Sequence, residues 1–319
     1  MNMAIAGFCI IGISFGVQPL LHTVTSEVLP RRWRAWGQAA DMASNGLGSI
    51  CGLLVGGALN RTNDPASDGF RRYYLMGMAW FVGAALLCAI VYTPPETAAQ
   101  RLYRGRTADK LKMLDWVGYL LLAAGLVLFC VGLSLSQNPY PWTDPKVSAT
   151  FATGIVLAFC LVGYETFVKR DGMFHHGLFT RDRNFSIALF CVFAEGMAFF
   201  AANIYFAFEV SVLYETDAVL VGTRYGIMLV CSMVGAALAG LYCDITRRVR
   251  WATVLAFVIF VVFFSCMAIA DRHSNTAVWG YPVLLGFALG ITLTTLVTVC
   301  QLSPAPELIA IASGLVINE

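Results

Sequence analysis

Apolar runs of about 20 residues recur along the whole chain, separated by short polar segments. A helix of about 20 apolar residues spans the hydrocarbon core of a bilayer, whereas a water-soluble domain of this length needs a charged exterior. The composition agrees, because 58% of the 319 residues are hydrophobic and only 13% are charged. The sequence therefore predicts an all-α, polytopic membrane protein that has the lipid bilayer as a partner.

Hydropathy windows of about 19 residues place nine membrane spans, and a tenth begins near Glu307. The nine spans are residues 3–26, 37–59, 73–93, 115–136, 148–168, 184–212, 219–243, 251–271 and 277–302. The first run has no basic segment before it and is longer than a signal-peptide core, so we interpret it as a mature span.

Basic residues predict which side of the membrane each loop occupies. Cytoplasmic loops retain Lys and Arg near the span ends, and one set of alternate loops holds 15 of the 21 basic residues. We therefore expect this set to be cytoplasmic and the first residue to lie outside, which indicates that spans precede it in a longer protein. The sequon that begins at Asn60 then lies outside, so Asn60 is a candidate glycosylation site.

Residues that bind metals or carry out catalysis do not cluster in the sequence. The ten cysteines stand singly, without the paired spacing of a disulfide framework or metal site, so we interpret them as small buried apolar residues. A membrane-embedded enzyme needs reactive side chains at one common depth, and four scattered histidines supply no such cluster. We expect no catalytic activity, no metal, no cofactor and no nucleic-acid partner.

Two segments of similar pattern form a faint internal repeat. GVQPLLHTVTSEVLP at 16–30 and GITLTTLVTVCQLSP at 290–304 each carry a proline 14 positions after a glycine. Both predicted spans run from outside to inside, and parallel repeats of this kind build one class of secondary transporters. In the first segment, Gln18 and His22 share a helical face. In the second segment, Thr294 and Thr298 share one. They either contact a solute or join neighbouring helices through hydrogen bonds.

The second span contains GSICGLLVGG, in which glycines recur every four residues. They are Gly48, Gly52, Gly56 and the adjoining Gly57. This spacing places bare backbone on one helical face, where another helix can approach closely. The stretch resembles the glycine motif of the fifth helix in antiporters of the major facilitator superfamily, G-x-x-x-G-P-x-x-G-G. That resemblance implies a role in limiting leak and favouring export, which the replacement of proline by Leu53 weakens; ordinary helix packing is the alternative.

Downstream segments extend the resemblance over nearly the whole chain. LDWVGYLLLAAGLVLFCVGLS, PYPW, HGLFTRDRNF and EGMAFF are similar in order and wording to fungal carriers of the trichothecene efflux pump and siderophore transporter group. Their fourteen-helix plan implies that this chain holds helices four to twelve and the start of thirteen, truncated at both ends. GLYCDITRRVRW is similar to the family's cytoplasmic gating loop, which implies that Asp244, Arg247 and Arg248 form a gate.

The same resemblance divides the chain into four parts. Residues 1–96 correspond to three spans of the N-terminal helical half, and residues 97–113 to a cytoplasmic linker. Residues 114–170 correspond to two inserted spans, and residues 171–319 to most of the C-terminal half.

The stretch FCVFAEGMAFF places one carboxylate, Glu195, in the middle of a predicted span. A mid-span acid costs about 2.5 to 3.5 kcal/mol on insertion scales, so we expect Glu195 to face the bundle interior or a watery cavity. Phe199 and Phe206 share its face, a suitable wall for a bulky, partly apolar solute. Glu195 either exchanges a proton or contacts the solute, or it is a protonated acid that only packs. Asp41 is a weaker candidate, since it can form a structural ion pair with Arg34.

These observations predict a proton-coupled secondary transporter that exports a small organic molecule, a toxin or drug, by alternating access. We expect it to act as a monomer in the plasma membrane, with the vacuolar membrane as the alternative. Uptake of an iron-siderophore complex is the competing function. A non-transporting fragment of such a carrier is a further alternative.

Overall fold

The computed structural model describes residues 2–16, 29–30, 33–59, 69–91, 115–136, 140–168, 183–215, 217–271 and 274–302. Over these residues the chain is helical, and no strand is present in the described part. Eight of the described helices are long and apolar enough to cross a membrane. The predicted all-α membrane bundle is therefore confirmed.

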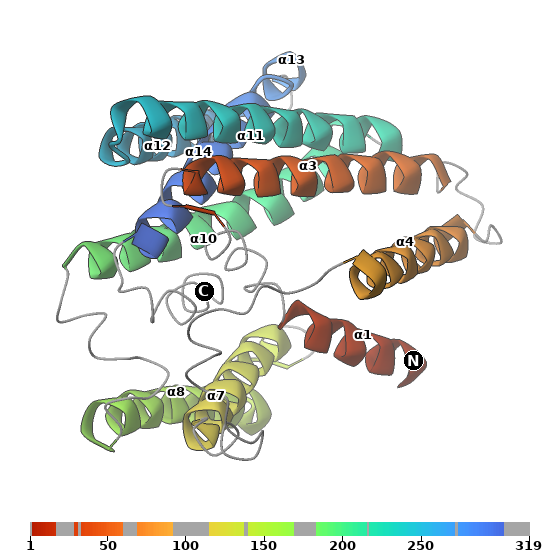
Figure 1. The fold of residues 1–319 in the computed structure, drawn as a ribbon. Coiled ribbons are helices and arrows are strands. Elements are labelled where there is room, and N and C mark those ends of the chain that lie inside the picture. The colour runs from red at the N-terminus through yellow and green to blue at the C-terminus, as the bar shows by residue number, and fades with distance from the viewer. Residues whose placement is uncertain are drawn as a thin grey trace. The chain divides into compact units, whose positions relative to one another are not determined.

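Figure 1 shows the helices in chain order. They are α1 (Asn2–Phe15), α3 (Arg34–Leu59), α4 (Gly69–Val91), α7 (Trp116–Leu135), α8 (Pro145–Gly163), the π-helical turn η1 (Tyr164–Val168), α10 (Arg183–Glu209), the π-helical turn η2 (Val210–Tyr214), α11 (Ala218–Thr246), α12 (Arg250–Ile269), α13 (Asn275–Val278) and α14 (Tyr281–Leu302). Eight of the nine predicted spans coincide with membrane-length helices. For the first span, the described part holds the 14 residues of α1.

The chain groups into two compact units, each with its own packing. One unit contains Met1–Pro94 and Asn184–Glu319, and the other contains Pro95–Arg183. The division into helical halves, linker and inserted spans stays a prediction.

The smaller unit is a closely packed helical hairpin of α7 and α8. Its buried residues are spaced seven apart on both helices; they are Gly118, Gly125, Gly132, Val147, Gly154 and Leu161. A Cβ on Gly154 would lie 2.5 Å from the backbone nitrogen of Phe129, and one on Gly132 would lie 2.8 Å from that of Phe151. A seven-residue repeat of this kind is typical of left-handed helix pairs, and glycine lets their backbones approach.

Aspartates fix where the two hairpin helices begin. Asp115 accepts a hydrogen bond from the backbone N–H of Gly118 at 3.1 Å. Asp144 accepts one from the N–H of Lys146 at 2.9 Å, and Pro145 follows as the first residue of α8. These side chains satisfy N–H groups that the first helical turn cannot pair, while proline supplies a helical φ without needing such a bond.

In the larger unit, α14 is the most buried helix, and it packs against α11, α12 and α3. A Cβ added to Gly286 or Gly290 would collide with the carbonyl oxygens of Met228 and Ser232 on α11. The apolar core around this helix pair includes Phe263. Lipid chains are as apolar as these side chains, so close packing rather than removal from water holds the helices together.

The cysteines are less buried than the sequence interpretation supposed. Cys243 and Cys300 are buried. Five others are exposed on the described helices, so the expectation of burial is wrong for Cys9, Cys51, Cys88, Cys130 and Cys160. A cysteine behaves as a small apolar residue, and it is compatible with a helix surface that faces lipid.

Candidate functional site

A cavity of about 320 Å³ is lined by residues of α3, α10, α11 and α14, all in the larger unit. Figure 1 labels these four helices. Its size falls in the range of small-molecule sites. The α11 and α14 backbones are in close contact, whereas α10 contacts the core through side chains such as Ala202 and Phe206. Among the described helices, α10 therefore approaches its neighbours less closely than α11 and α14 approach each other.

Glu195 lines this cavity, and its side chain is only 5% exposed. It is the thirteenth residue of the 27-residue helix α10, so it lies at mid-helix as the sequence predicts. Among the described residues, its Oε1 atom has no hydrogen-bond partner. A carboxyl group in this position can gain stabilisation from a bound proton or from a donor group on a solute.

The two phenylalanines on the Glu195 face have different surroundings. Phe199 lines the cavity. Phe206 is 2% exposed and belongs to the apolar core around Met228. The structure therefore places Phe199 beside a possible solute and Phe206 in helix packing.

Three polar candidates on the described helices, Asp41, Thr294 and Thr298, lie outside the cavity lining. Asp41 is half-buried on α3, one residue before Met42, which does line the cavity. Thr294 and Thr298 are buried in α14, where the Thr298 hydroxyl donates to the Thr294 carbonyl at 2.6 Å. The α14 residues that do line the cavity are apolar, so this wall presents no hydroxyl. The roles of Asp41 and the threonines stay predictions.

The glycine motif of α3 has open surroundings in the described part of the chain. A Cβ on Gly48 would meet nothing within 4 Å, while those on Gly52 and Gly56 would meet the Tyr73 ring of α4. Gly57 is half-buried next to them. The neighbours that the structure supplies here are side-chain atoms, and the conformational role of the motif stays a prediction.

The segment assigned to a gate lies at the end of α11. Asp244 is in the last turn, and Arg247 caps the helix with a left-handed backbone (φ 54°). The N–H of Arg248 donates to the hydroxyl of Thr246 at 3.3 Å. A left-handed backbone is uncommon for arginine and costs about 1 to 2 kcal/mol. Its gating role stays a prediction.

Three candidates lie outside the described residues. They are Gln18 and His22, from the first half of the repeat, and Asn60, the glycosylation candidate.

The cavity also contains polar residues that sequence reasoning missed. Asn45 and Ser49 of α3 and Tyr225 and Ser232 of α11 line it with Glu195. Asn45 and Ser49 are spaced four apart near the middle of a predicted span, and that pattern could have identified them. The residues on α11 have no comparable signal, because hydroxyls are common in membrane helices.

Sequence reasoning also missed the buried position of Arg224. Arg224 lies in α11, and its side chain is 1% exposed. Its guanidinium donates to Asn275 Oδ1 at 2.6 Å, lies 3.6 Å from a carboxylate oxygen of Glu215 and stacks 4.4 Å from the Trp279 ring. These contacts stabilise the buried charge, while Nε and Nη1 have no hydrogen-bond partner among the described residues.

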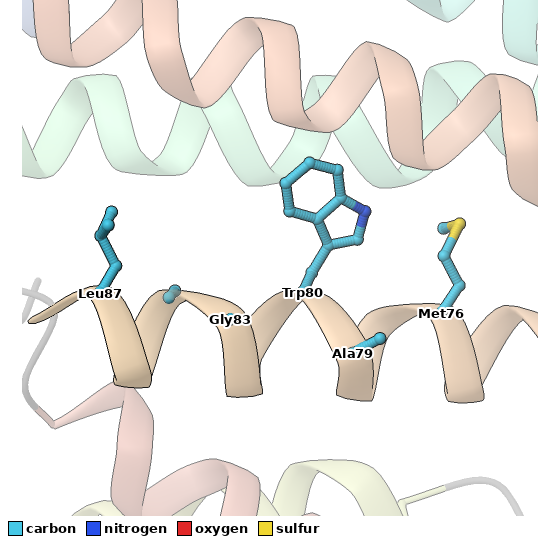
Figure 2. Close-up of a pocket in the computed structure, with 6 residues that line it drawn as sticks. Met76, Ala79, Trp80, Gly83 and Leu87 are labelled. Carbon is cyan, nitrogen blue, oxygen red and sulfur yellow. The ribbon is translucent and has the colours of Figure 1, made fainter.

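A larger hollow, of about 480 Å³, lies on α4. Figure 2 shows that Met76, Trp80 and Leu87 project from one face of this single helix. It is lined by apolar residues of α4 alone, and Trp80 is 75% exposed. A one-sided apolar face suits contact with lipid chains, so we assign the functional site to the smaller cavity, which four helices enclose.

A profile of the Major Facilitator Superfamily matches residues 1–317. The chain is 22% identical over 300 residues to the trichothecene efflux pump TRI12 of Trichoderma arundinaceum, covering 91% of this chain and 48% of that protein. It is 23% identical over 309 residues to the MFS-type efflux transporter ffsH of Aspergillus flavipes, covering 94% and 52%. It is 20% identical over 302 residues to multidrug resistance protein 3 of Bacillus subtilis (strain 168), covering 93% and 54%.

The eight membrane-length helices of the described residues define a multi-pass membrane protein. The chain belongs to the Major Facilitator Superfamily, as its sequence resemblance predicted. It spans about half the length of the curated relatives it matches.

Proposed function

We propose that this chain forms part of a proton-coupled efflux transporter that moves a small organic toxin or drug across a membrane by alternating access. The relatives that carry efflux in their names support export. The siderophore-uptake alternative gains no support from them. The plasma membrane is the proposed site of action, with the vacuolar membrane as the alternative, and the monomer is the proposed working unit.

One observation carries the proposal: the buried carboxyl group of Glu195 lines a cavity at mid-helix. Secondary transporters place solute and coupling-ion sites near the bilayer midplane, where two helical halves meet. In the proposed division, α3 belongs to the half at 1–96 and α10, α11 and α14 to the half at 171–319. When the two halves rotate relative to each other, a cavity between them would open first to one side of the membrane and then to the other.

A proton on Glu195 is the proposed link between the gradient and the solute. The carboxyl group can take up a proton while the cavity is open to one side of the membrane and release it when the cavity is open to the other side. Among the described residues that line the cavity, Glu195 is the single charged one, so we assign this proton to it.

The test measures efflux of a trichothecene or a drug from cells that express the chain, with and without a protonophore. Glu195→Gln keeps the size of the side chain but cannot titrate, so gradient-driven efflux should fall to the level of cells without the protein. Glu195→Asp should retain part of it. Glu209→Gln, on the same helix but outside the cavity lining, is the matched control and should transport normally.

All variants are compared at equal amounts in the membrane. Undiminished gradient-driven efflux by Glu195→Gln would leave Glu195 as a packing residue and remove the coupling role. A wild-type chain that expresses and folds but moves neither compound would instead favour the non-transporting fragment.

A further inference from the structure

The cavity lining is polar on one side and apolar on the other. From α14 the cavity receives only aliphatic side chains, among them Leu289, Leu293 and Val297. From α3 it receives Asn45 and Ser49. A solute that fills this space therefore meets hydrocarbon along one edge and polar groups along another.

Asn45 and Ser49 form a pair on consecutive turns of α3. The Ser49 hydroxyl donates to Asn45 Oδ1 at 3.3 Å. This bond uses the amide oxygen as its acceptor, so the two N–H donors of the Asn45 amide take no part in it. The pairing orients the amide and leaves its donor side available to a ligand.

The position of Asn45 makes a purely structural role costly. Asn45 is the twelfth residue of the 26-residue helix α3; it is an exposed residue, and it lines the cavity. At this depth an unpaired amide facing lipid is unfavourable. Large apolar residues occupy other exposed positions of the same helix, such as Leu47 and Leu54.

We infer that Asn45, oriented by Ser49, recognises the transported molecule through a hydrogen bond to an acceptor oxygen. The solute class is neutral and largely apolar, with a carbonyl, ether or similar oxygen on one edge. This inference rests on the proposed function, since it names the solute of that cavity. Asn45 is a specificity-determining residue, whereas Glu195 carries the proton.

Charge in the lining favours a neutral solute. No Lys or Arg of the described helices lines the cavity, so an anion there would lose its hydration without gaining a charged partner from them. A cation would occupy Glu195 and compete with the proton. A neutral molecule with an acceptor oxygen satisfies the amide donors and leaves the carboxyl group free to titrate.

Three probes of similar size test the inference on the purified chain in detergent micelles. 9-Fluorenone carries one carbonyl oxygen on its edge, fluorene has the same ring skeleton without it, and proflavine is a planar cation. Dissociation constants are obtained from the ligand-dependent shift in the thermal unfolding midpoint, corrected for partition into micelles. One neutral hydrogen bond corresponds to about fivefold to tenfold in affinity, so fluorenone should bind that much more tightly than fluorene.

In Asn45→Leu the fluorenone-to-fluorene preference should fall to about onefold, while fluorene still binds. Ser49→Ala should weaken the preference partly, because the amide loses its orienting partner. Ser44→Ala is the matched control, since its hydroxyl donates to the Ala40 carbonyl within α3 and is not part of the cavity. It should keep the full preference.

Several outcomes would overturn the inference. They are equal binding of fluorenone and fluorene by the wild type, an unchanged preference in Asn45→Leu, strongest binding of proflavine, and no binding of any probe. If Asn45→Leu loses fluorene as well, Asn45→Ala is measured, and a second loss identifies Asn45 as a packing residue. Because binding needs no gradient, a Glu195→Gln chain that keeps the preference but does not transport separates the two proposals.

Discussion

Glycines spaced four residues apart occur on α3 and on α14, but the two sets have different neighbours. On α14, Gly286 and Gly290 lie directly against backbone atoms of α11. On α3, Gly48 has no atom near its missing side chain, and Gly52 and Gly56 lie beside the ring of Tyr73. The same spacing thus produces a backbone contact in one helix and a face with side-chain neighbours in the other.

The difference shows that glycine spacing permits close approach without specifying a partner. A glycine contact between two backbones cannot relax by rotating a side chain, whereas a contact with a tyrosine ring can. The α7–α8 hairpin follows the α14 pattern, because Gly154 faces the backbone of Phe129. Substitution of these glycines by alanine, which adds one methyl group, should therefore destabilise the protein most where a backbone lies closest.

The largest effect is expected for Gly290→Ala. The new Cβ would overlap the Ser232 carbonyl oxygen, so α11 and α14 would have to separate along their contact. We expect a loss of about 3 kcal/mol or more, seen as a lower unfolding midpoint in micelles and aggregation on size exclusion. Gly226→Ala on α11, which meets nothing within 4 Å, is the control. An unchanged unfolding midpoint for Gly290→Ala would show that the backbones of α11 and α14 are farther apart at Gly290 than in the structure.

A somewhat smaller effect is expected for Gly154→Ala in the hairpin. Its Cβ would lie 2.5 Å from the Phe129 backbone nitrogen, which costs about 1 to 3 kcal/mol of overpacking. Hydrogen exchange should increase in α7 and α8. Gly163→Ala, in the same helix but with nothing within 4 Å, should leave exchange unchanged. Equal exchange in both variants would contradict a glycine-dependent hairpin.

A small effect is expected for Gly56→Ala. The Cβ would lie 3.2 Å from Cε2 of Tyr73, and the ring can move by a few tenths of an ångström. The unfolding midpoint should fall by an amount equivalent to about 1 kcal/mol or less. Tyr73→Ala in the same background should remove that cost. A loss as large as that of Gly290→Ala would mean that a backbone, rather than a ring, lies against this face.

The smallest effect on stability is expected for Gly48→Ala. Its Cβ would meet nothing within 4 Å, and alanine gains about 0.5 to 1 kcal/mol of helix preference over glycine. The midpoint should stay the same or rise slightly. Transport is the sharper measurement, since a loss of efflux at unchanged stability would reveal a conformational role for the motif. Normal efflux would leave ordinary packing as the explanation.

Sequence reasoning predicted the local features of this chain well. Apolar length identified eight helices of membrane-spanning length, because twenty apolar residues report directly on the thickness of a bilayer. It placed Glu195 in the middle of a helix, and the structure shows it lining a cavity. It missed Arg224, because a hydropathy window cannot detect that Asn275, 51 residues away, accepts its hydrogen bond.

By itself the sequence determined the membrane environment, the family and the mid-helix carboxylate, all of which depend on runs and motifs within one segment. Only the tertiary structure decided which polar residues share a cavity. Glu195, Asn45 and Ser232 come from three helices, and their proximity depends on how α3, α10 and α11 pack. Glycine behaves in the same way. Any backbone can approach a residue without a side chain, so only the packing of the helices selects the backbone that lies against it.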